Sequence, residues 1–196
     1  RQSDNKFVNL LNKIRMNKLQ NEDLSILNNQ LINREEVPKD TIILAPNNRK
    51  VEDINNTNLY KLTTPTFNYN AIVKGSWKDK EHPVKKEIVL KVGAQVMITK
   101  NDTDEPKRWV NGTLGIITFL SKDQIKIKIK DKIFSLGKTK WDKYNYKFSG
   151  NKVNAFSVGS FIQFPLKLAW ATTIHKSQGQ TFDNVSIDLD TGSFAH

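Results

Sequence analysis

The sequence contains no cysteine, which excludes disulfide bonds and thiolate metal sites. It also lacks a secretory signal and any apolar run approaching the roughly 20 residues that a membrane-spanning helix needs. Hydrophobic residues make up 37% of the 196 positions and charged residues 26%, which is typical of a soluble globular domain. We therefore expect an intracellular protein, cytoplasmic or nucleoid-associated, with no membrane partner.

A nucleotide-binding phosphate loop of the form G-x-x-x-x-G-K-[ST] is also missing. Gly137-Lys138-Thr139 is the nearest match, but Lys132 stands where the first glycine is required. The segment also lies among expected β-strands, whereas a phosphate loop joins a strand to a helix. No acidic pair follows an apolar strand to hold magnesium. The chain by itself is therefore not expected to hydrolyse ATP, and its first residue, Arg1 rather than Met, indicates a piece of a longer protein.

Acidic residues are outnumbered mainly in the middle of the chain. The net charge is +11, and residues 65–160 carry 19 Lys and Arg against 9 Asp and Glu. Residues 1–64 carry a net charge of +2 and residues 161–196 a net charge of −1. A localised basic field attracts polyanions such as nucleic acids. The alternative is that lysine simply fills solvated surface positions.

The first third of the sequence predicts helices and one buried strand. Apolar residues recur at spacings of three and four over residues 6–33, which indicates amphipathic helices, with Asp23 placed to cap the second. Residues 41–45 form a short apolar run between turn residues and predict a strand. A helix is expected over residues 49–60. A strand, a polar turn and a helix form half of a βαβ unit.

Residues 62–91 show little regular pattern and are interpreted as a connector. From Ile88 onward apolar residues alternate with polar ones, which predicts several short strands and a small antiparallel barrel. The alternation is strict over residues 125–130, where three isoleucines face one side and Lys126, Lys128 and Lys130 the other.

The segment Phe164–Leu189 reads FPLKLAWATTIHKSQGQTFDNVSIDL and brings polar groups together. Pro165 is placed to begin a helix and Gly179 to end one. The expected last turn is rich in hydrogen-bond donors, namely Thr173, His175, Lys176, Ser177 and Gln178. Residues 184–189 then alternate as a strand does. A helix of donors that runs into a strand is typical of a phosphate-facing edge of an α/β sheet.

Three stretches resemble superfamily I DNA helicases of the PIF and RecD type. They are LAWATTIHKSQGQTFDNVSIDL at 168–189, VGAQVMITKN at 92–101 with WVNGTLG at 109–115, and RQSD at 1–4 with LNKIR at 11–15. They occur in the family's order and span nearly the whole chain. The first resembles the family's motif V, the second its VNG signature and the third its FRQ region.

The resemblance implies a partial RecA-like parallel sheet interrupted by a small SH3-like antiparallel barrel. The implied divisions are 1–64 for the first part of the second RecA-like domain, 65–91 for a connector, 92–159 for the inserted barrel, and 160–196 for the rest of the second RecA-like domain. The first RecA-like domain, with the phosphate loop and the magnesium-binding acid, would precede Arg1. ATP and magnesium would then be cofactors of the parent enzyme, bound between the two domains.

The resemblance also implies roles for individual residues. Arg1 matches the arginine that reaches the γ-phosphate, where a guanidinium stabilises developing charge; the alternative is a terminal arginine with no fixed place. Gln178 and Gly179 match residues that face the nucleotide cleft. The expected contacts to single-stranded DNA phosphates come from Asn48, Thr173, His175, Lys176 and Ser177. Asn47 stands where the family has threonine.

Two further DNA contacts are proposed from the residues themselves. Lys126, Lys128 and Lys130 form a basic strand face that can follow a phosphate backbone, although a merely solvated face is an equal alternative. Trp109 lies beside two basic residues and can stack on a base if it is exposed, whereas core packing is the alternative. The glycines of the VNG signature, Gly112 and Gly115, are interpreted as turn and packing residues.

Taken together, the sequence predicts the C-terminal part of an ATP-dependent DNA helicase that moves 5′ to 3′ on single-stranded DNA, with roles in DNA repair and recombination. One alternative is a helicase subunit of an exonuclease V-like or relaxase complex. Another is a non-enzymatic basic nucleic-acid-binding module. A phosphate loop upstream of Arg1 and an arginine-bearing motif downstream of His196 would favour the helicase over the module.

Overall fold

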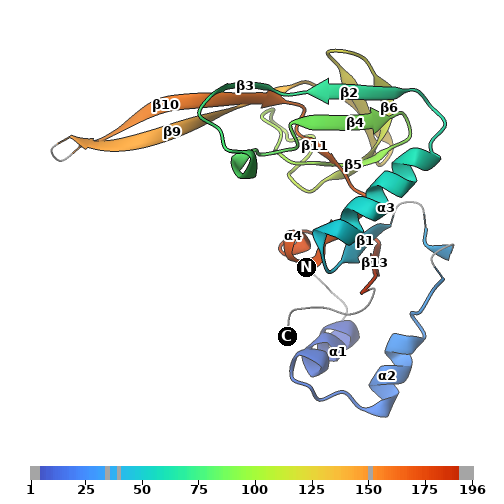
Figure 1. The fold of residues 1–196 in the computed structure, drawn as a ribbon. Coiled ribbons are helices and arrows are strands. Elements are labelled where there is room, and N and C mark those ends of the chain that lie inside the picture. The colour runs from blue at the N-terminus through green and yellow to red at the C-terminus, as the bar shows by residue number, and fades with distance from the viewer. Residues whose placement is uncertain (1–4, 34–35, 39–40, 150–151, 190–196) are drawn as a thin grey trace.

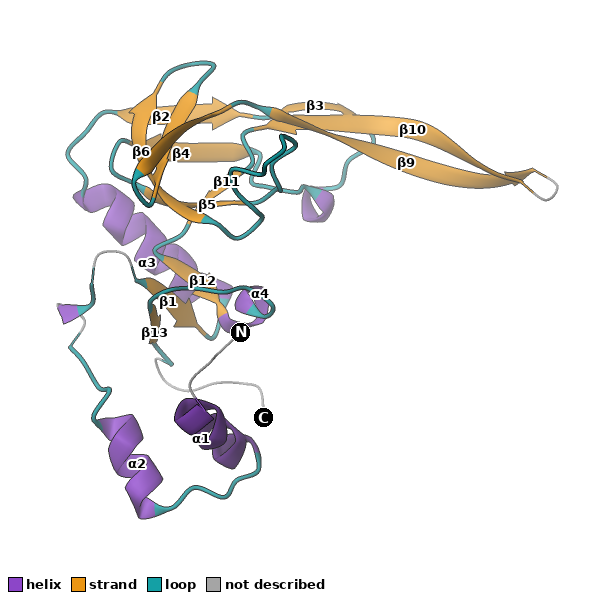
Figure 2. Ribbon diagram, turned by 180° about the vertical axis from the view of Figure 1, so that it is seen from behind, coloured by secondary structure: helices purple, strands orange, loops and turns teal. Residues whose placement is uncertain are grey.

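The computed structural model describes residues 5–33, 36–38, 41–149 and 152–189. Its upper part is built from antiparallel strands, and a small parallel sheet with helix α3 lies below them (Figure 1). A long hairpin projects from the upper part, and helices α1 and α2 lie at the opposite end (Figures 1 and 2). No helix in the described ranges is long and apolar enough to cross a membrane.

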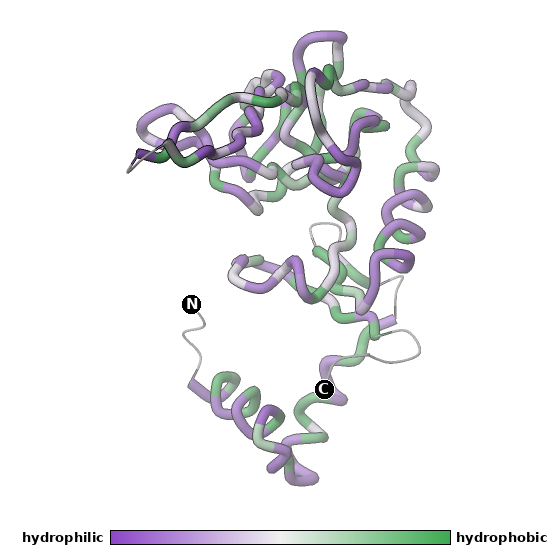
Figure 3. Tube along the Cα trace, turned by 60° about the vertical axis from the view of Figure 1, so that its left-hand side comes forward, coloured by the Kyte–Doolittle hydropathy of each residue, from purple (hydrophilic) through white to green (hydrophobic). Residues whose placement is uncertain are grey.

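The parallel sheet joins two distant parts of the chain. Strand β1 (Ile42–Ala45) lies between β12 (Ala171–Thr173) and β13 (Val185–Ile187) and is parallel to both. Helix α3 (Asn48–Lys61) follows β1 and packs on β12 and β1. The predicted strands at 41–45 and 184–189 and the predicted helix at 49–60 are confirmed. Helix α3 is mainly hydrophilic (Figure 3), because only one stripe of it faces the sheet.

A five-stranded antiparallel sheet forms the main part of the upper body. Its order is β11-β5-β6-β7-β8. The strands are β5 (Gln95–Ile98), β6 (Leu114–Leu120), β7 (Ile125–Ile129), β8 (Lys132–Leu136) and β11 (Leu166–Leu168). The predicted alternation along β7 is confirmed, since its isoleucines at 125 and 127 are buried and Lys126 and Lys128 are exposed.

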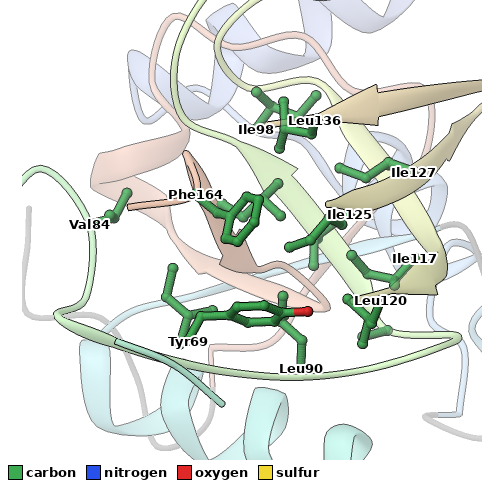
Figure 4. Packing of buried hydrophobic residues seen from close by; sticks show 14 of the residues in the cluster. Tyr69, Val84, Leu90, Ile98, Ile117, Leu120, Ile125, Ile127, Leu136 and Phe164 are labelled. Carbon is green, nitrogen blue, oxygen red and sulfur yellow. The ribbon is translucent and has the colours of Figure 1, made fainter. Parts of the chain in front are cut away.

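The expected closed barrel is not seen. Within the described strands, β11 and β8 are the two edges of the five-stranded sheet and do not pair with each other. The open side is covered instead by β2 (Thr66–Asn70), β4 (Glu87–Lys91) and β10 (Lys152–Gln163), which contribute Tyr69, Leu90 and Phe161 to one hydrophobic core. Figure 4 shows this core, in which Phe164 and Tyr69 meet edge to face with ring centroids 5.0 Å apart. Separate sheets around one core therefore replace a single ring.

Two local predictions were wrong. The connector at 62–91 is not irregular, because it contains β2, β3 (Ile72–Gly75), the 3₁₀ turn η2 (Asp79–Glu81) and β4, and β2 pairs with β4. The segment from Pro165 to Gly179 is not one helix, because β11 pairs with β5 and β12 pairs with β1. Only α4 (Ile174–Ser177) is helical there. Pairing with distant strands has overridden the local helix signal.

Helices α1 (Asn5–Arg15) and α2 (Asn21–Asn28) lie together at the lower end (Figure 1). Asp23 joins them, since its carboxylate accepts a hydrogen bond from the Lys13 ammonium at 2.8 Å. The same carboxylate accepts the Gln20 backbone N–H at 2.9 Å and so caps the start of α2, as predicted.

The long hairpin consists of β9 (Thr139–Ser149) and β10, which pair along almost their whole length. At its base β3 pairs with β10 on the side away from β9. Gly75 and Gly159 allow this close pairing. A Cβ on Gly75 would stand 2.2 Å from the Val158 carbonyl oxygen, and one on Gly159 would stand 2.7 Å from the Lys74 carbonyl oxygen.

Candidate nucleic-acid interface

The carboxyl ends of β1 and β12 lie side by side at one edge of the parallel sheet. Ala45 and Thr173, the last residues of these strands, are register partners. The chain therefore leaves both strands at the same edge, where α3 and α4 begin. In open α/β sheets, this edge is where ligands bind.

Asn48 and Lys176, which are 128 residues apart in sequence, meet at this edge. The Lys176 ammonium donates a hydrogen bond to the Asn48 side-chain oxygen, with an Nζ–Oδ1 distance of 3.2 Å. Both residues are exposed. The structure thus brings together two of the predicted DNA-contacting residues, and leaves an amide nitrogen and a cation open to an anion from solvent.

Asn47 and Thr173 cap the two helices that start at this edge. The Asn47 side-chain oxygen accepts the Lys50 backbone N–H at 2.9 Å, and the Thr173 hydroxyl oxygen accepts the Lys176 backbone N–H at 3.3 Å. Thr173 is buried, and the half-buried Ser177 hydroxyl donates to the Ile174 carbonyl at 2.7 Å. Both hydroxyls therefore fix the backbone beneath Lys176. These bonds position the exposed cation.

Asn55 of α3 anchors the edge strand β12 from within the protein. Its amide nitrogen donates to the Ala171 carbonyl at 3.1 Å, and its amide oxygen accepts the Ala171 N–H at 2.9 Å. The side chain is buried, and its two bonds satisfy backbone groups that have no strand neighbour on that side. The position of Thr173 and α4 therefore depends on α3.

Lys167 of β11 is a partly buried lysine that the sequence reasoning did not single out. Its side chain has no ion pair or hydrogen bond in the described part of the chain. Burial lowers the pKa of its ammonium group, and the nearby positive charge of Lys176 lowers the pKa further. An anion bound near both lysines would relieve this repulsion. A single lysine inside the apolar stretch FPLKLAW was the signal in the sequence.

The loop after α4 lies against the turn of the VNG signature. Gly179 has a φ of +78° and open space around its Cα, and both it and Gln178 are exposed. The next residue, Gln180, lies against Gly112, whose added Cβ would stand 3.2 Å from the Gln180 Cδ. Gly112 has a φ of +95°, which confirms its interpretation as a turn residue.

A cleft of about 730 Å³ extends from this loop to the basic strand β7. Gly179 and Gln180 line one side of it, and Lys128 and Lys130 line the other. The structure therefore brings Lys128 of β7, and Lys130 of the turn after it, to the loop that follows α4. The predicted place of Lys130 on the strand face is wrong, because β7 ends at Ile129 and Lys130 has a φ of +51°. Lys126 does not line the cleft; its ammonium lies 5.5 Å from the centre of the Phe119 ring.

Trp109 does not offer a face to a base. It is only 8% exposed, its ring meets Phe134 edge to face at 5.9 Å, and the Arg108 guanidinium lies 4.5 Å from its centre. The interpretation as an exposed stacking residue is corrected to core packing. Arg108 is held there by Asp102, whose buried carboxylate accepts two bonds from the guanidinium, at 2.6 and 2.7 Å.

His175 is exposed, and its ring has no hydrogen bond within the described residues. Arg1 lies outside those residues. The described part of the chain has no group of three His, Asp or Glu placed to hold a metal, and the sequence has no phosphate loop.

No protein-family model matches the chain. Among curated relatives, ATP-dependent DNA helicase Pif1 of Bdellovibrio bacteriovorus is 32% identical over 194 residues, covering 96% of this chain and 42% of the relative. ATP-dependent DNA helicase PIF1 of Danio rerio is 32% identical, covering 96% of this chain and 30% of the relative. The chain therefore spans less than half the length of the curated relatives it matches.

Solved structures agree with these relatives. Unliganded Pif1 from Bacteroides sp. superposes with a TM-score of 0.85 at 32% identity, over 97% of this chain and 44% of that one. Bacteroides Pif1 in complex with ADP-AlF4 superposes with a TM-score of 0.81 at 33% identity, over 95% of this chain and 43% of that one. Bacteroides Pif1 bound to single-stranded DNA superposes with a TM-score of 0.73 at 32% identity, over 95% of this chain and 43% of that one.

A parallel sheet with a basic, polar carboxyl edge, joined to antiparallel sheets, defines an α/β region suited to anionic ligands. The relatives described above narrow this region to one class of protein. Over almost its whole length the chain is similar to Pif1 helicases, and it matches less than half of each of them.

Proposed function

We propose that this chain is the DNA-gripping part of an ATP-dependent DNA helicase that moves 5′ to 3′ on single-stranded DNA. One observation carries the proposal: Asn48 and Lys176 meet on the exposed carboxyl edge of the parallel sheet. A Pif1 structure bound to single-stranded DNA, similar over 95% of this chain, supports DNA as the anion. An exposed amide and ammonium on rigid backbone suit a phosphate without reading base sequence.

In this proposal one stretch of DNA phosphate backbone is held by Asn48, His175, Lys176 and Lys167. The hydroxyl groups of Thr173 and Ser177 fix the protein backbone beneath Lys176. The cleft beside Gly179 extends the basic surface toward Lys128 and Lys130. Gln178 and Gly179, exposed on the loop after α4, face the nucleotide that the rest of the parent protein binds. The proposed nucleotide is ATP with magnesium, supported by the ADP-AlF4 complex of a related Pif1.

The proposed domain organisation of the chain follows from its similarity to Pif1 helicases. Residues 1–64 and 160–196 form the second RecA-like domain, residues 65–91 connect it to the insert, and residues 92–159 form an SH3-like insert. The pairing of β1 with β12 and β13 supports the first point, because it joins the two ends of the chain in one parallel sheet. ATP-driven closing and opening against the first RecA-like domain would then move one DNA grip past the other.

The test is the ATPase of the full-length enzyme with and without an oligo(dT) strand. Lys176→Ala is expected to reduce the DNA-stimulated rate at a fixed DNA concentration at least about fivefold and leave the basal rate unchanged, because a phosphate contact is typically worth about 1 kcal/mol or more. Lys18→Ala is the matched control, since Lys18 is exposed in the loop between α1 and α2. Equal loss of both rates in Lys176→Ala would contradict the proposal.

A further inference from the structure

The outer half of the β9–β10 hairpin carries aromatic side chains that the fold does not bury. Tyr144, Tyr146 and Phe148 are 48%, 67% and 83% exposed, and Val153 opposite Phe148 is 56% exposed. The hairpin projects from the body in both views (Figures 1 and 2), so no described element covers its end. None of the three rings contacts another aromatic ring in the described residues.

The aromatic residues lie on the face of the hairpin that points away from the core. At the base of the hairpin, Trp141 and its register partner Phe161 pack together on the core side, with ring centroids 6.0 Å apart. Side chains alternate between faces along a strand. Trp141 and Lys143 therefore share the core side, and Lys143 bonds Glu81 of η2 there. Tyr144, Tyr146 and Phe148 point to the other side.

This arrangement reverses the usual pattern, in which a strand directs its apolar residues to the core and its polar residues to water. The residues opposite the aromatics across the hairpin are Val153, Ala155 and Ser157, which are small or medium-sized. They leave the rings raised above the face. Packing within the described protein does not account for three aromatic residues in these positions, so their role is expected to involve a partner.

The charge of the hairpin favours a polyanion as that partner. Residues 143–163 include three lysines and no aspartate or glutamate. Lys147 and Lys152 near the end of the hairpin have no ion pair in the described part of the chain. Because side chains alternate along a strand, Lys147 and Lys152 lie on the opposite face of this narrow hairpin from the three rings. Aromatic rings together with unpaired cations are the combination with which proteins bind single-stranded nucleic acid.

The spacing of the rings also suits unpaired bases. Residues two apart on a strand are about 7 Å apart. An extended single strand can place successive bases at a similar spacing, and each ring can stack on one base without reading its identity. Tyrosine is well suited to such a surface, since its ring is apolar and its hydroxyl remains in water.

We propose that Tyr144, Tyr146 and Phe148 form a stacking surface for unpaired DNA bases, separate from the phosphate grip at Asn48 and Lys176. This inference rests on the proposed function in so far as the ligand is single-stranded DNA. The two sites differ in what they hold: the hairpin contacts bases through rings, and the edge of the parallel sheet contacts phosphates through donors.

The experiment measures binding of the full-length protein to two fluorescein-labelled strands of about 20 nucleotides, one oligo(dT) and one abasic along its whole length. Tyr146→Ala combined with Phe148→Ala is expected to weaken oligo(dT) binding at least about tenfold, because each stacked base contributes roughly a five- to hundredfold gain in affinity. Abasic binding should stay unchanged. Tyr60→Ala on α3, where Tyr60 is 87% exposed, is the matched control and should change neither.

Conservative substitution separates ring chemistry from folding. Tyr144→Phe combined with Tyr146→Phe keeps the rings and should retain oligo(dT) affinity within about twofold. Lys176→Ala, measured in the same assay, should weaken both strands equally. One result would overturn the stacking surface alone. In it, Lys176→Ala weakens binding, but the Tyr146→Ala, Phe148→Ala protein keeps the wild-type affinity for oligo(dT). A wild-type protein that binds neither strand would instead overturn the proposed function.

A second measurement addresses a protein partner. Sedimentation velocity of the wild-type and Tyr146→Ala, Phe148→Ala proteins at the same concentration should give the same molecular mass. A wild-type dimer that dissociates in the variant, with unchanged oligo(dT) affinity, would assign the aromatic face to a second copy of the chain and would overturn the proposal.

Discussion

Asn55 determines where the exposed residues of the candidate site lie, although it is itself buried. Both of its amide atoms bond the backbone of Ala171, and no other described group is placed to replace them. Asn55→Ala is expected to lower the free energy of unfolding by about 2–4 kcal/mol, because two buried backbone groups lose their partners. Urea denaturation measures this. Asn56→Ala, exposed on the same helix, is the control and should stay within about 0.5 kcal/mol of wild type.

Asp102 makes the stability of the loop before Trp109 dependent on pH. The side-chain hydrogen bonds from Arg108 hold the pKa of the Asp102 carboxyl well below its ordinary value of 3.8. A carboxyl group whose pKa is lowered by folding stabilises the folded state above its ordinary pKa, and this contribution is lost as the pH falls toward the folded pKa.

Asp102→Asn should therefore be less stable than wild type by a constant amount above about pH 5, and the difference should shrink as the pH falls below 3.8. Urea midpoints measured from pH 7 down to pH 3 test this. Asp104→Asn is the matched control, because Asp104 also pairs with Arg108 but is 60% exposed. A difference that stays constant across the whole range would contradict the assigned role of Asp102.

The same residues show what the sequence could reveal about the site. Lys176 and Asn48 were predicted separately, from a family resemblance, and their contact needed the parallel pairing of β1 with β12. Lys167 was missed because its burial depends on β5, which lies about 70 residues earlier in the chain. Trp109 was assigned to DNA because adjacent basic residues suggest exposure, whereas Arg108 in fact lies over its ring.

Among the elements, β3 and β10 depend on glycine where they meet. Gly75 has a φ of +75° and no room for a side chain beside Val158. Gly75→Ala is therefore expected to cost at least about 2 kcal/mol, since a non-glycine residue is strained at this φ and its Cβ would meet backbone atoms. Thermal or urea unfolding gives the value.

Gly137→Ala serves as the control for Gly75→Ala. Gly137 lies in the turn between β8 and β9, with nothing within 4 Å of an added Cβ and no positive φ. The free energy of unfolding of the Gly137→Ala protein should remain within about 1 kcal/mol of the wild-type value. Equal destabilisation by the two substitutions would show that the β3–β10 contact is not what makes Gly75 necessary.

The elements that sequence reasoning identified are those whose signal is local. The Ile–Lys alternation of β7 predicts both the strand and its buried face, because period-two patterning by itself places alternate residues on opposite faces. The three-residue strands β11 and β12 carry no such period, and only hydrogen bonds to β5 and β1 define them. The alternation of Phe67 and Tyr69 was a usable signal for β2 that the connector interpretation passed over.

At the scale of the whole molecule, this chain carries the residues proposed to contact DNA but no phosphate loop. The 196-residue chain alone should therefore show no ATP turnover above a no-enzyme blank in the presence of oligo(dT) and magnesium. The parent protein measured in parallel is the positive control. Steady turnover by the chain alone would mean that an unrecognised nucleotide site lies within these residues.

The distribution of charge gives the last prediction, which concerns how strongly salt weakens DNA binding. Lys126, Lys128 and Lys130 are all exposed and belong to the segment that carries most of the net positive charge, and Lys128 and Lys130 line the cleft beside Gly179. Each lysine that contacts a phosphate releases a counterion from single-stranded DNA. Replacing all three by glutamine should reduce the slope of log affinity against log salt by up to about 2.

A matched variant separates local contact from overall charge. Replacing Lys6, Lys18 and Lys61 by glutamine removes the same charge from exposed positions on α1, the loop after it and α3. If total charge alone attracts DNA, the slope of log affinity against log salt should decrease by the same amount in both triple variants. If β7 is part of the DNA path, the loss should be confined to the first variant, because counterion release depends on contact with the phosphates and not on charges more than about a Debye length away.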